Sequence, residues 1–238
     1  FNVDEVQDVT TCETYTLPAL TVGNYFNGPN GTGGMIPQGS QVTTTKTIYV
    51  FAYSGFTPNC SDETSFDVTI IDTPTVNPVP ASLRILCDED GTNDGVTTID
   101  LTTITSSVLG SQIGPEFNVT YYESFNDASN NTNAITATTL TTIYARVNNS
   151  LAPNCYDIKP INFIINKIPE PELQDGIVCI DSNGGLLNSY TITSGLSAST
   201  HTFEWFDANG IIVGTASSYV AVLPGTYSLL ATNISTGC

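Results

Sequence analysis

Six cysteines are the residues of this 238-residue chain with the plainest capacity for chemistry. A thiolate can bind zinc or act as a nucleophile, and two thiols can join in a disulfide. The wide spacing and the absence of any Cys-x-x-Cys pair argue against zinc, so we expect disulfides of an exported protein. The six are Cys12, Cys60, Cys87, Cys155, Cys179 and Cys238.

An acidic segment follows the third cysteine. Its alternating carboxylates could surround Ca²⁺, a hard cation that takes roughly six to eight oxygen ligands, although the spacing is not that of an EF-hand. Its Asp-Gly pairs would equally supply the positive-φ residues of a tight turn. Both interpretations stay open, and no other cofactor is expected. The calcium ligands would be Asp88, Asp90, Asp94 and Asp100.

No catalytic constellation accompanies these residues. The chain has one histidine, His201, and no Gly-x-Ser-x-Gly sequence, so a serine hydrolase is not predicted. Paired carboxylates that cleave glycosides would need a deep cleft, which small modules rarely provide. We therefore expect a protein that is not an enzyme.

Aromatic side chains offer a binding chemistry instead. They stack on sugars in carbohydrate-binding modules, but they more commonly pack in cores and interfaces. The sequence leaves both uses open for Tyr25, Phe26, Phe51, Tyr53 and Phe56.

An internal repeat organises the elements that must position these residues. A tyrosine precedes a cysteine by eleven residues three times, at Tyr49 and Cys60, Tyr144 and Cys155, and Tyr227 and Cys238. The first two copies share more, because Thr57-Pro58-Asn59-Cys60-Ser61-Asp62 resembles Ala152-Pro153-Asn154-Cys155-Tyr156-Asp157.

The repeat predicts three modules, at residues 1–73, 74–168 and 169–238. Modules this small are near the lower limit of what a hydrophobic core supports, so covalent bonds should reinforce them. Each module has one cysteine upstream of its Tyr–Cys pair. We predict one disulfide inside each module, which gives Cys12–Cys60, Cys87–Cys155 and Cys179–Cys238.

The modules are predicted to be almost entirely β. β-branched and aromatic residues are abundant, and turn signals such as Asp90-Gly91 and Asn209-Gly210 recur along the chain. A hairpin is expected where residues 201–206 precede Asn209-Gly210. Prolines mark linkers near residues 72–80 and 168–173, and such segments favour an elongated array.

Two features concern single strands. In one strand Ile143, Ala145 and Val147 alternate, which predicts that Tyr144 and Arg146 face outward; the facing of the three repeat tyrosines Tyr49, Tyr144 and Tyr227 is not settled. The other modules continue after their second cysteine into a last strand. The third module stops at Cys238, so we expect a fragment of a longer array whose third module lacks its last strand.

The charge limits the partners. With 23 acidic and 5 basic residues, the formal net charge is −18. Nucleic acids and anionic membranes bind clustered basic residues, so neither is expected. No run of apolar residues is long enough to predict membrane insertion.

The modules resemble immunoglobulin-like sandwiches. Trp205 lies in a mid-module strand, and Tyr227 precedes a late cysteine. More specifically, the chain resembles tandem repeats of the large surface proteins that gliding Bacteroidetes export by type 9 secretion, the SprB-like adhesins and their relatives. Residues 15–25, 47–50, 58–63, 121–124, 142–147, 224–227 and 236–238 carry this resemblance.

The resemblance implies a secreted segment of a bacterial cell surface, an adhesin or filament stalk whose partners are neighbouring repeats and surface glycans or proteins. It transfers no catalytic residue. Two alternatives stay open: a carbohydrate-binding module of a secreted protein that acts on polysaccharides, and an inert spacer for a distant functional domain.

Overall fold

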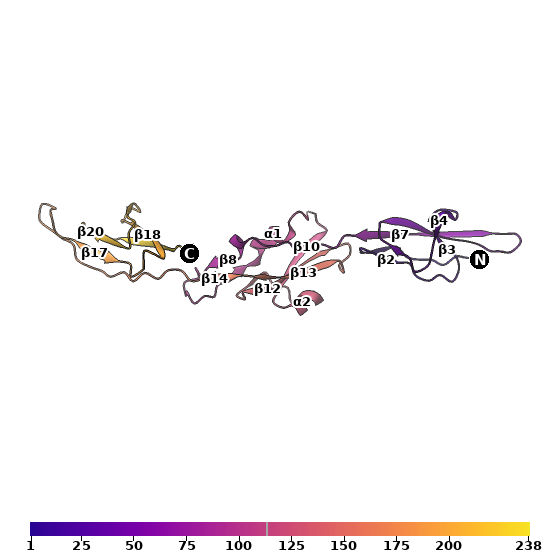
Figure 1. The fold of residues 1–238 in the computed structure, drawn as a ribbon, viewed down its shortest axis with the longest axis horizontal. Coiled ribbons are helices and arrows are strands. Elements are labelled where there is room, and N and C mark those ends of the chain that lie inside the picture. Colours follow the sequence, from indigo (N-terminus) through magenta and orange to yellow (C-terminus); the bar gives the residue numbers. More distant parts are fainter. Residues whose placement is uncertain (113) are drawn as a thin grey trace. The chain divides into compact units, whose positions relative to one another are not determined.

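The computed structural model describes residues 1–112 and 114–238 (Figure 1). By contact density the chain divides into two compact units. The N-terminal unit contains Phe1–Pro80 and Asp100–Asn162, and the C-terminal unit contains Ala81–Ile99 and Phe163–Cys238. Strands dominate the regular structure of both units, which confirms the all-β prediction.

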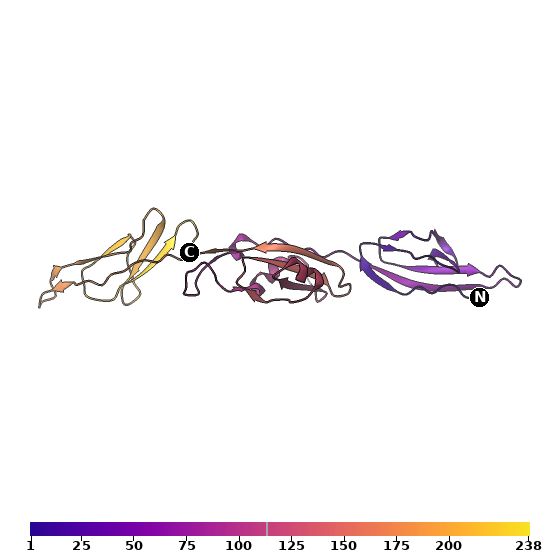
Figure 2. The same cartoon turned by 90° about the horizontal axis from the view of Figure 1, so that it is seen from below.

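A five-stranded sheet forms the first part of the N-terminal unit (Figures 1 and 2). Its order is β1-β7-β6-β3-β4; β1 and β7 are parallel, and the other neighbours are antiparallel. A short antiparallel pair, β2 with β5, stands apart from it. The strands are β1 (Val9–Cys12), β2 (Tyr15–Thr16), β3 (Asn24–Gly28), β4 (Thr32–Ile36), β5 (Gln41–Val42), β6 (Lys46–Tyr53) and β7 (Ser61–Ile71).

The core between these two sheets follows from strand alternation. Ile48 and Val50 of β6 point to the same side and are fully buried, as is Tyr25 of β3. They cluster with Leu17 and Val42, which come from the β2–β5 side. Each such side chain stabilises the fold by about 2 kcal/mol through burial. This is the layered packing of a β-sandwich.

The rest of the N-terminal unit surrounds a three-stranded antiparallel sheet of order β10-β12-β13. Asp100 caps the 3-10 helix by accepting a hydrogen bond from the Thr102 N–H, and Ser124 caps α2 in the same way through the Asp127 N–H. The elements are η2 (Leu101–Ile104), α1 (Thr105–Leu109), β10 (Phe117–Tyr122), α2 (Phe125–Asn130), β11 (Ala137–Thr138), β12 (Thr142–Asn149) and β13 (Tyr156–Asn162).

The C-terminal unit contains several small sheets. β8 pairs with β14 in parallel; β15–β16, β17–β20 and β19-β18-β21 are antiparallel. The β18–β19 pair confirms the hairpin predicted around residues 201–214. The elements are η1 (Ala81–Leu83), β8 (Ile85–Cys87), β14 (Ile164–Asn166), β15 (Cys179–Ile180), β16 (Leu186–Asn188), β17 (Tyr190–Thr193), β18 (His201–Phe206), β19 (Ile212–Gly214), β20 (Ser218–Ala221) and β21 (Ser228–Asn233); β9 (Ile99–Asp100) lies at the division.

Trp205 is the centre of the small core in the C-terminal unit. It is fully buried, stacks on Tyr219 and donates its indole N–H to the Ala216 carbonyl at 2.8 Å. Phe203, two residues earlier on β18, and Ala221 on β20 are buried with it. The sequence feature that suggested an immunoglobulin-like module is therefore a core residue joining two sheets.

The contact-based division does not follow the three predicted modules, whose boundaries stay a prediction. The longer sheets nevertheless each draw their strands from one module: β1 to β7 from residues 1–73, β10 to β13 from 74–168, and β17 to β21 from 169–238. Val76 and Val79, within the predicted linker at residues 72–80, are buried; the linker bounds also stay a prediction.

Candidate functional site: the cysteine-bearing loops and strands

The upstream cysteines Cys12 and Cys87 occupy equivalent places in two sheets. Cys12 ends β1, which pairs in parallel with β7 so that Cys12 lies opposite Ile71. Cys87 ends β8, which pairs in parallel with β14 so that Cys87 lies opposite Asn166. Each upstream cysteine therefore lies beside the end of its module's last strand, where the chain leaves for the following module.

The loop cysteines Cys60, Cys155 and Cys238 also share one local structure. In each loop the cysteine carbonyl accepts a hydrogen bond from a backbone N–H five or six residues earlier. The separation is six residues for Cys60 and Cys155 and five for Cys238, so the first two loops close identically and the third is one residue shorter. The donors are Ser54 for Cys60 at 2.8 Å, Asn149 for Cys155 at 3.1 Å and Asn233 for Cys238 at 2.6 Å.

The predicted Cys12–Cys60 disulfide is wrong, and strand geometry gives the reason. Cys60 immediately precedes β7, whereas Cys12 lies opposite the last residue of that strand. The eleven residues of β7 span roughly 33 Å at about 3.3 Å per residue. A disulfide requires Cα atoms within about 7 Å, so these cysteines lie at opposite ends of the sheet and cannot meet.

The predicted Cys179–Cys238 disulfide is wrong for the same reason. Residues 172–179 run antiparallel to residues 188–194. The Glu172 N–H donates to the Ser194 carbonyl at one end of this pair of segments. Cys179 pairs with Asn188 at the other end. Cys238 is held by Asn233, which pairs with His201 just beyond the loop that follows Ser194. The two cysteines therefore lie toward opposite ends of the third predicted module.

The observed disulfides connect one predicted module to the next. Cys12 bonds to Cys155, with Cα atoms 5.4 Å apart, and Cys87 bonds to Cys238, with Cα atoms 5.5 Å apart. These bonds also replace the predicted Cys87–Cys155 pair. In both, the upstream cysteine of one module meets the loop cysteine of the following one. Cys60 and Cys179 are free and exposed.

Two aspartates beside the loop cysteines hold a neighbouring segment of the chain, a role that was not predicted from the sequence. Asp62 accepts a hydrogen bond from the Val3 N–H at 2.8 Å, and Asp157 accepts one from the Val76 N–H at 2.9 Å. Both valines are buried. Each aspartate stands two residues after its cysteine, so their recurrence in the shared motif was the signal that could have identified them.

Arg146 supports the Cys155 loop. Its guanidinium donates to the Ala128 carbonyl of α2 and to the Pro153 carbonyl, both at 3.0 Å. The same group lies 3.7 Å from the centre of the Tyr156 ring, a cation–π contact. Arg146 is on the outer face of β12, as alternation predicts, but α2 and the loop cover it and leave it 4% exposed.

The structure does not assemble the four predicted calcium ligands. Asp90 and Asp94 each accept a hydrogen bond from a backbone N–H two residues later, and Asp100 caps η2. Hydrogen bonds from Thr92 lower the pKa of Asp90, and those from Thr102 lower the pKa of Asp100. Among residues 1–112 and 114–238, no three acidic, histidine or cysteine side chains gather in a way that could hold a metal.

Asp88 differs from its acidic neighbours because it is completely buried. Its Oδ2 accepts the Gly95 N–H at 2.6 Å, while its Oδ1 has no hydrogen-bond partner in the described part of the chain. The acidic segment is therefore a turn organised around a buried carboxylate. Calcium binding at Asp88, Asp90, Asp94 and Asp100 stays a prediction.

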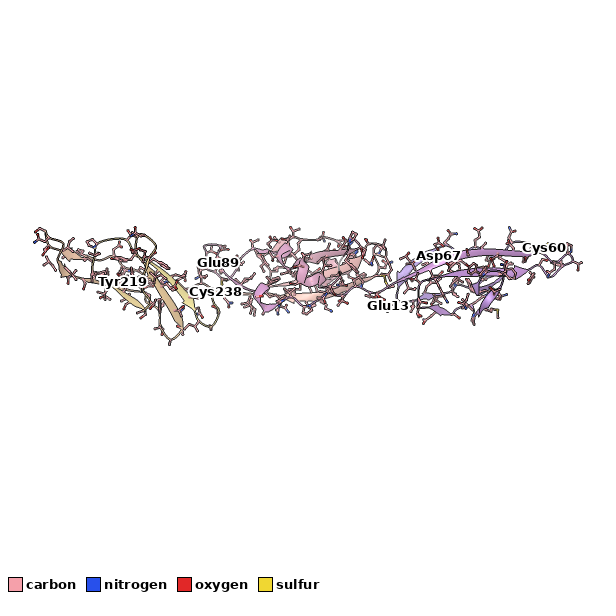
Figure 3. The ribbon with its side chains drawn as sticks, turned by 90° about the horizontal axis from the view of Figure 1, so that it is seen from above. Glu13, Cys60, Asp67, Glu89, Tyr219 and Cys238 are labelled. Carbon is pink, nitrogen blue, oxygen red and sulfur yellow. A yellow bond between two sulfur atoms is a disulfide. The ribbon has the colours of Figure 1, made fainter. Side chains whose placement is uncertain are left out.

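The aromatic residues divide between core and surface. Tyr25 and Phe51 are buried, and burial raises the pKa of Tyr25 to about 12. Tyr53 and Phe56 are exposed. Tyr53 ends β6 opposite Ser61, the residue after the free Cys60, and Figure 3 shows Cys60 at the end of the β6–β7 hairpin. The three repeat tyrosines are all half-buried; Tyr227 donates its hydroxyl to the Leu223 carbonyl at 2.9 Å.

A cavity of about 390 Å³ lies in the C-terminal unit. Its lining includes Tyr190, Ile192, Leu223 and Tyr227. The Tyr190 hydroxyl donates a hydrogen bond to the Gln174 carbonyl at 3.3 Å.

Across the described residues, no helix is long and apolar enough to cross a membrane.

Comparison with known proteins gives one family match. A model described as the Flavobacterium inter-domain disulphide bond domain matches residues 84–169. No curated protein matches the chain.

Among solved structures, Sidekick-1 immunoglobulin domains 1-5 are 10% identical, with 97% of this chain and 55% of that one covered and a TM-score of 0.32. The human Desmocollin-1 ectodomain is 10% identical, with 98% and 57% covered and a TM-score of 0.21. The chain thus spans about half the length of these structures. TM-scores this low do not establish a shared fold, so the assignment rests on the sheets and cores described above.

Proposed function

We propose that the chain is a structural, non-enzymatic segment of a secreted repeat protein whose successive modules are joined by disulfides. The observation that carries the proposal is the connection of Cys12 to Cys155 and of Cys87 to Cys238. The matched family segment, residues 84–169, contains Cys87 and Cys155 and neither of their partners. Both of its cysteines therefore bond outside the segment, and the description of the family model names an inter-domain disulphide bond.

The two bonds have a mechanical consequence. A junction held by a peptide linker and a disulfide bends less than one held by the linker alone, because two covalent connections fix its orientation. The bonds also shorten the covalent path along which a pulling force is transmitted. The two chain segments that the disulfides close overlap in sequence, since Cys87 lies between Cys12 and Cys155 while Cys238 lies beyond them.

The shortest covalent path from Phe1 to Cys238 crosses both bonds. It runs 11 residue steps to Cys12, crosses to Cys155, returns 68 steps to Cys87 and crosses to Cys238. The linear chain between the same ends has 237 steps. At about 3.5 Å per residue, the full extension is roughly 280 Å for the oxidised chain and roughly 830 Å for the reduced one.

Force spectroscopy on the full chain, held at its two ends, tests this function. We expect the reduced chain to extend about three times as far as the oxidised chain. The control is the variant Cys60→Ser, which removes a free thiol and should extend like the parent. Equal extension of the oxidised and reduced chains would contradict the proposal.

We further propose that the segment belongs on a bacterial surface, as an adhesin or filament stalk exported by type 9 secretion and serving gliding. The support is the sequence resemblance, together with disulfides that persist in oxidising compartments. Inactivating type 9 secretion in the host should retain the protein inside the cell. Unchanged surface display in such a host would contradict this export route.

A carbohydrate-binding module is the second candidate, because two tyrosines line the cavity of the C-terminal unit. A glycan array with the parent chain and with Tyr190→Ala separates the candidates. Binding that Tyr190→Ala abolishes, and that Tyr53→Ala on the exposed hairpin does not affect, would favour glycan recognition. An inert spacer would bind no glycan and no surface protein.

A further inference from the structure

The two disulfides join four points of the chain into two covalent nodes. Cys12 and Cys155 form the first node, and Cys87 and Cys238 form the second. Because Cys87 lies between the two cysteines of the first bond, three separate stretches of chain run from one node to the other. They are the first segment (residues 12–87), the second segment (residues 87–155) and the third segment (residues 155–238).

The three segments have similar lengths. The first has 75 residue steps between its cysteines, the second has 68 and the third has 83. At about 3.5 Å per residue, their full extensions are roughly 260, 240 and 290 Å, so the second segment limits the separation of the nodes. At that separation the other two are stretched to more than about four-fifths of their full lengths. All three segments must therefore unfold before the nodes can move that far apart.

Hydrogen bonds also tie the segments to one another. β12 of the second segment pairs with β13 of the third along its whole length, and β8 at the end of the first pairs with β14 of the third. The first segment is held to the third at Val76 as well. Its N–H donates to Asp157 at 2.9 Å, and its carbonyl accepts the Lys159 ammonium at 3.0 Å. Strands from different segments thus share sheets, so no segment is displaced without breaking bonds to another.

We propose that the crossed disulfides load the three segments in parallel when tension is applied at Phe1 and Cys238. The predicted modules then resist extension together and yield in one large step. This sharing of load rests on the disulfides of the proposed function, and it concerns the force at which the chain yields rather than the length that it reaches. In the reduced chain the same modules lie in series, so each carries the whole tension and the weakest yields first.

Parallel loading requires both bonds. Without Cys12–Cys155, the covalent path runs 86 steps from Phe1 to Cys87 and crosses to Cys238, so only the first segment is loaded. Without Cys87–Cys238, the path crosses from Cys12 to Cys155 and runs 83 steps to Cys238, so only the third segment is loaded. The full extensions are then roughly 300 and 330 Å, against roughly 280 Å with both bonds. Loss of one bond should therefore change the yield force far more than the extension.

Force spectroscopy on the full chain, held through peptide tags at its two ends, tests the sharing of load. The parent is compared with two double variants at one loading rate, Cys12→Ser with Cys155→Ser and Cys87→Ser with Cys238→Ser. The oxidised parent should show a short extension as the residues before Cys12 detach, and then one large step. The reduced parent should yield in several smaller steps.

The yield force decides the outcome. The large step of the oxidised parent should need a higher force than the main step of either double variant or any step of the reduced parent. Equal forces in the parent and the double variants would overturn parallel loading, as would separate steps for each module in the oxidised parent. Neither result touches the proposed function, which fails only if the oxidised and reduced chains extend equally.

An insertion keeps all four bonded cysteines, so its result does not depend on folding without a disulfide. Ten glycine and serine residues placed after Gly210, in the exposed β18–β19 turn, lengthen the third segment. The oxidised chain should extend no further, because the second segment still limits it, whereas the reduced chain should gain about 35 Å. A gain of 35 Å in the oxidised chain would overturn the proposal.

The matched control places the same ten residues in the second segment, after the exposed Asn133. The second segment then becomes longer than the first, which takes over as the limit on the separation of the nodes. The oxidised chain should therefore gain roughly 25 Å instead of the full 35 Å. The full gain here would show that the second segment carries the tension alone and would contradict parallel loading.

Discussion

The Cys60 and Cys155 loops follow the same sequence motif and the same backbone hydrogen bond, yet one is free and the other is bonded. Cys60 is exposed, whereas Cys155 is completely buried. The repeat places Phe51 in the first module where the second has Arg146. Phe51 packs on Phe26 and Tyr53, while Arg146 reaches across to the loop itself.

The difference teaches that the loop conformation is local and the disulfide is not. A closed backbone turn and an aspartate two residues after the cysteine are present in both loops. The bond depends on which module supplies the other sulfur. The loop conformation is therefore the same in both modules, and a disulfide forms only where an upstream cysteine of the neighbouring module lies beside the loop.

Removing the bonded pair should have the largest effect on stability. The double variant Cys12→Ser with Cys155→Ser loses a bond between residues 143 apart, which is worth at most roughly 5 kcal/mol on the chain-entropy model. Urea unfolding followed by circular dichroism measures the loss. Cys60→Ser should change the free energy of unfolding by less than about 0.5 kcal/mol. Equal losses would contradict the distinction between the two loops.

Replacing Arg146 should have the second-largest effect on stability. Arg146→Met removes the donors to the Ala128 and Pro153 carbonyls, and we expect a loss of about 2–4 kcal/mol because two hydrogen bonds from a charged donor and its cation–π contact with Tyr156 are lost together. Phe51→Met at the equivalent position should cost about 1 kcal/mol, since one apolar side chain replaces another. Thermal unfolding of both variants measures the difference. If Phe51→Met costs as much, the arginine has no special role in its loop.

Asp62 and Asp157 test whether the Cys60 and Cys155 loops are equivalent, because both aspartates accept a hydrogen bond from a buried valine N–H. Asp62→Ala and Asp157→Ala each leave one buried valine N–H without its acceptor, so each should cost about 1–2 kcal/mol. The Lys159 ammonium, 3.2 Å from Asp157, adds little because it is half-exposed. Hydrogen exchange of the Val3 and Val76 amides should accelerate in the corresponding variant. A large loss in one module alone would show that the motifs are not equivalent.

The sequence predicted what local spacing determines. Alternation of Ile143, Ala145 and Val147 gave the correct buried face of β12, because the two faces of a strand alternate strictly. The same pattern placed Arg146 outward but could not show that α2 covers that face. Periodicity tells which side of a sheet a residue occupies, and only tertiary packing decides whether that side is buried.

The disulfide pairing could not be predicted from local sequence patterns. Choosing between Cys12–Cys60 and Cys12–Cys155 requires the direction of β7 and the end of the sheet at which each cysteine lies. That direction was available in part, since a strand was expected directly after Cys60. What the sequence lacked was the parallel pairing of β1 with β7, a contact between residues about sixty positions apart.

Calcium removal is expected to have the smallest effect on stability. The comparison is between the acidic residue beside the bonded Cys87 and the one beside the free Cys179. Asp88 beside Cys87 is buried, and one of its oxygens has no hydrogen-bond partner among the described residues, whereas Asp181 beside Cys179 is exposed and accepts the Asn183 N–H. Asp90 and Asp94 already accept backbone N–H groups, so few ligands are left for an ion. We therefore expect EDTA to leave the midpoint of thermal unfolding unchanged. If calcium instead raises the midpoint in the parent, and Asp88→Asn abolishes that rise while Asp181→Asn does not, then Asp88 is a metal ligand and the bonded junction is stiffened by an ion as well as by its disulfide.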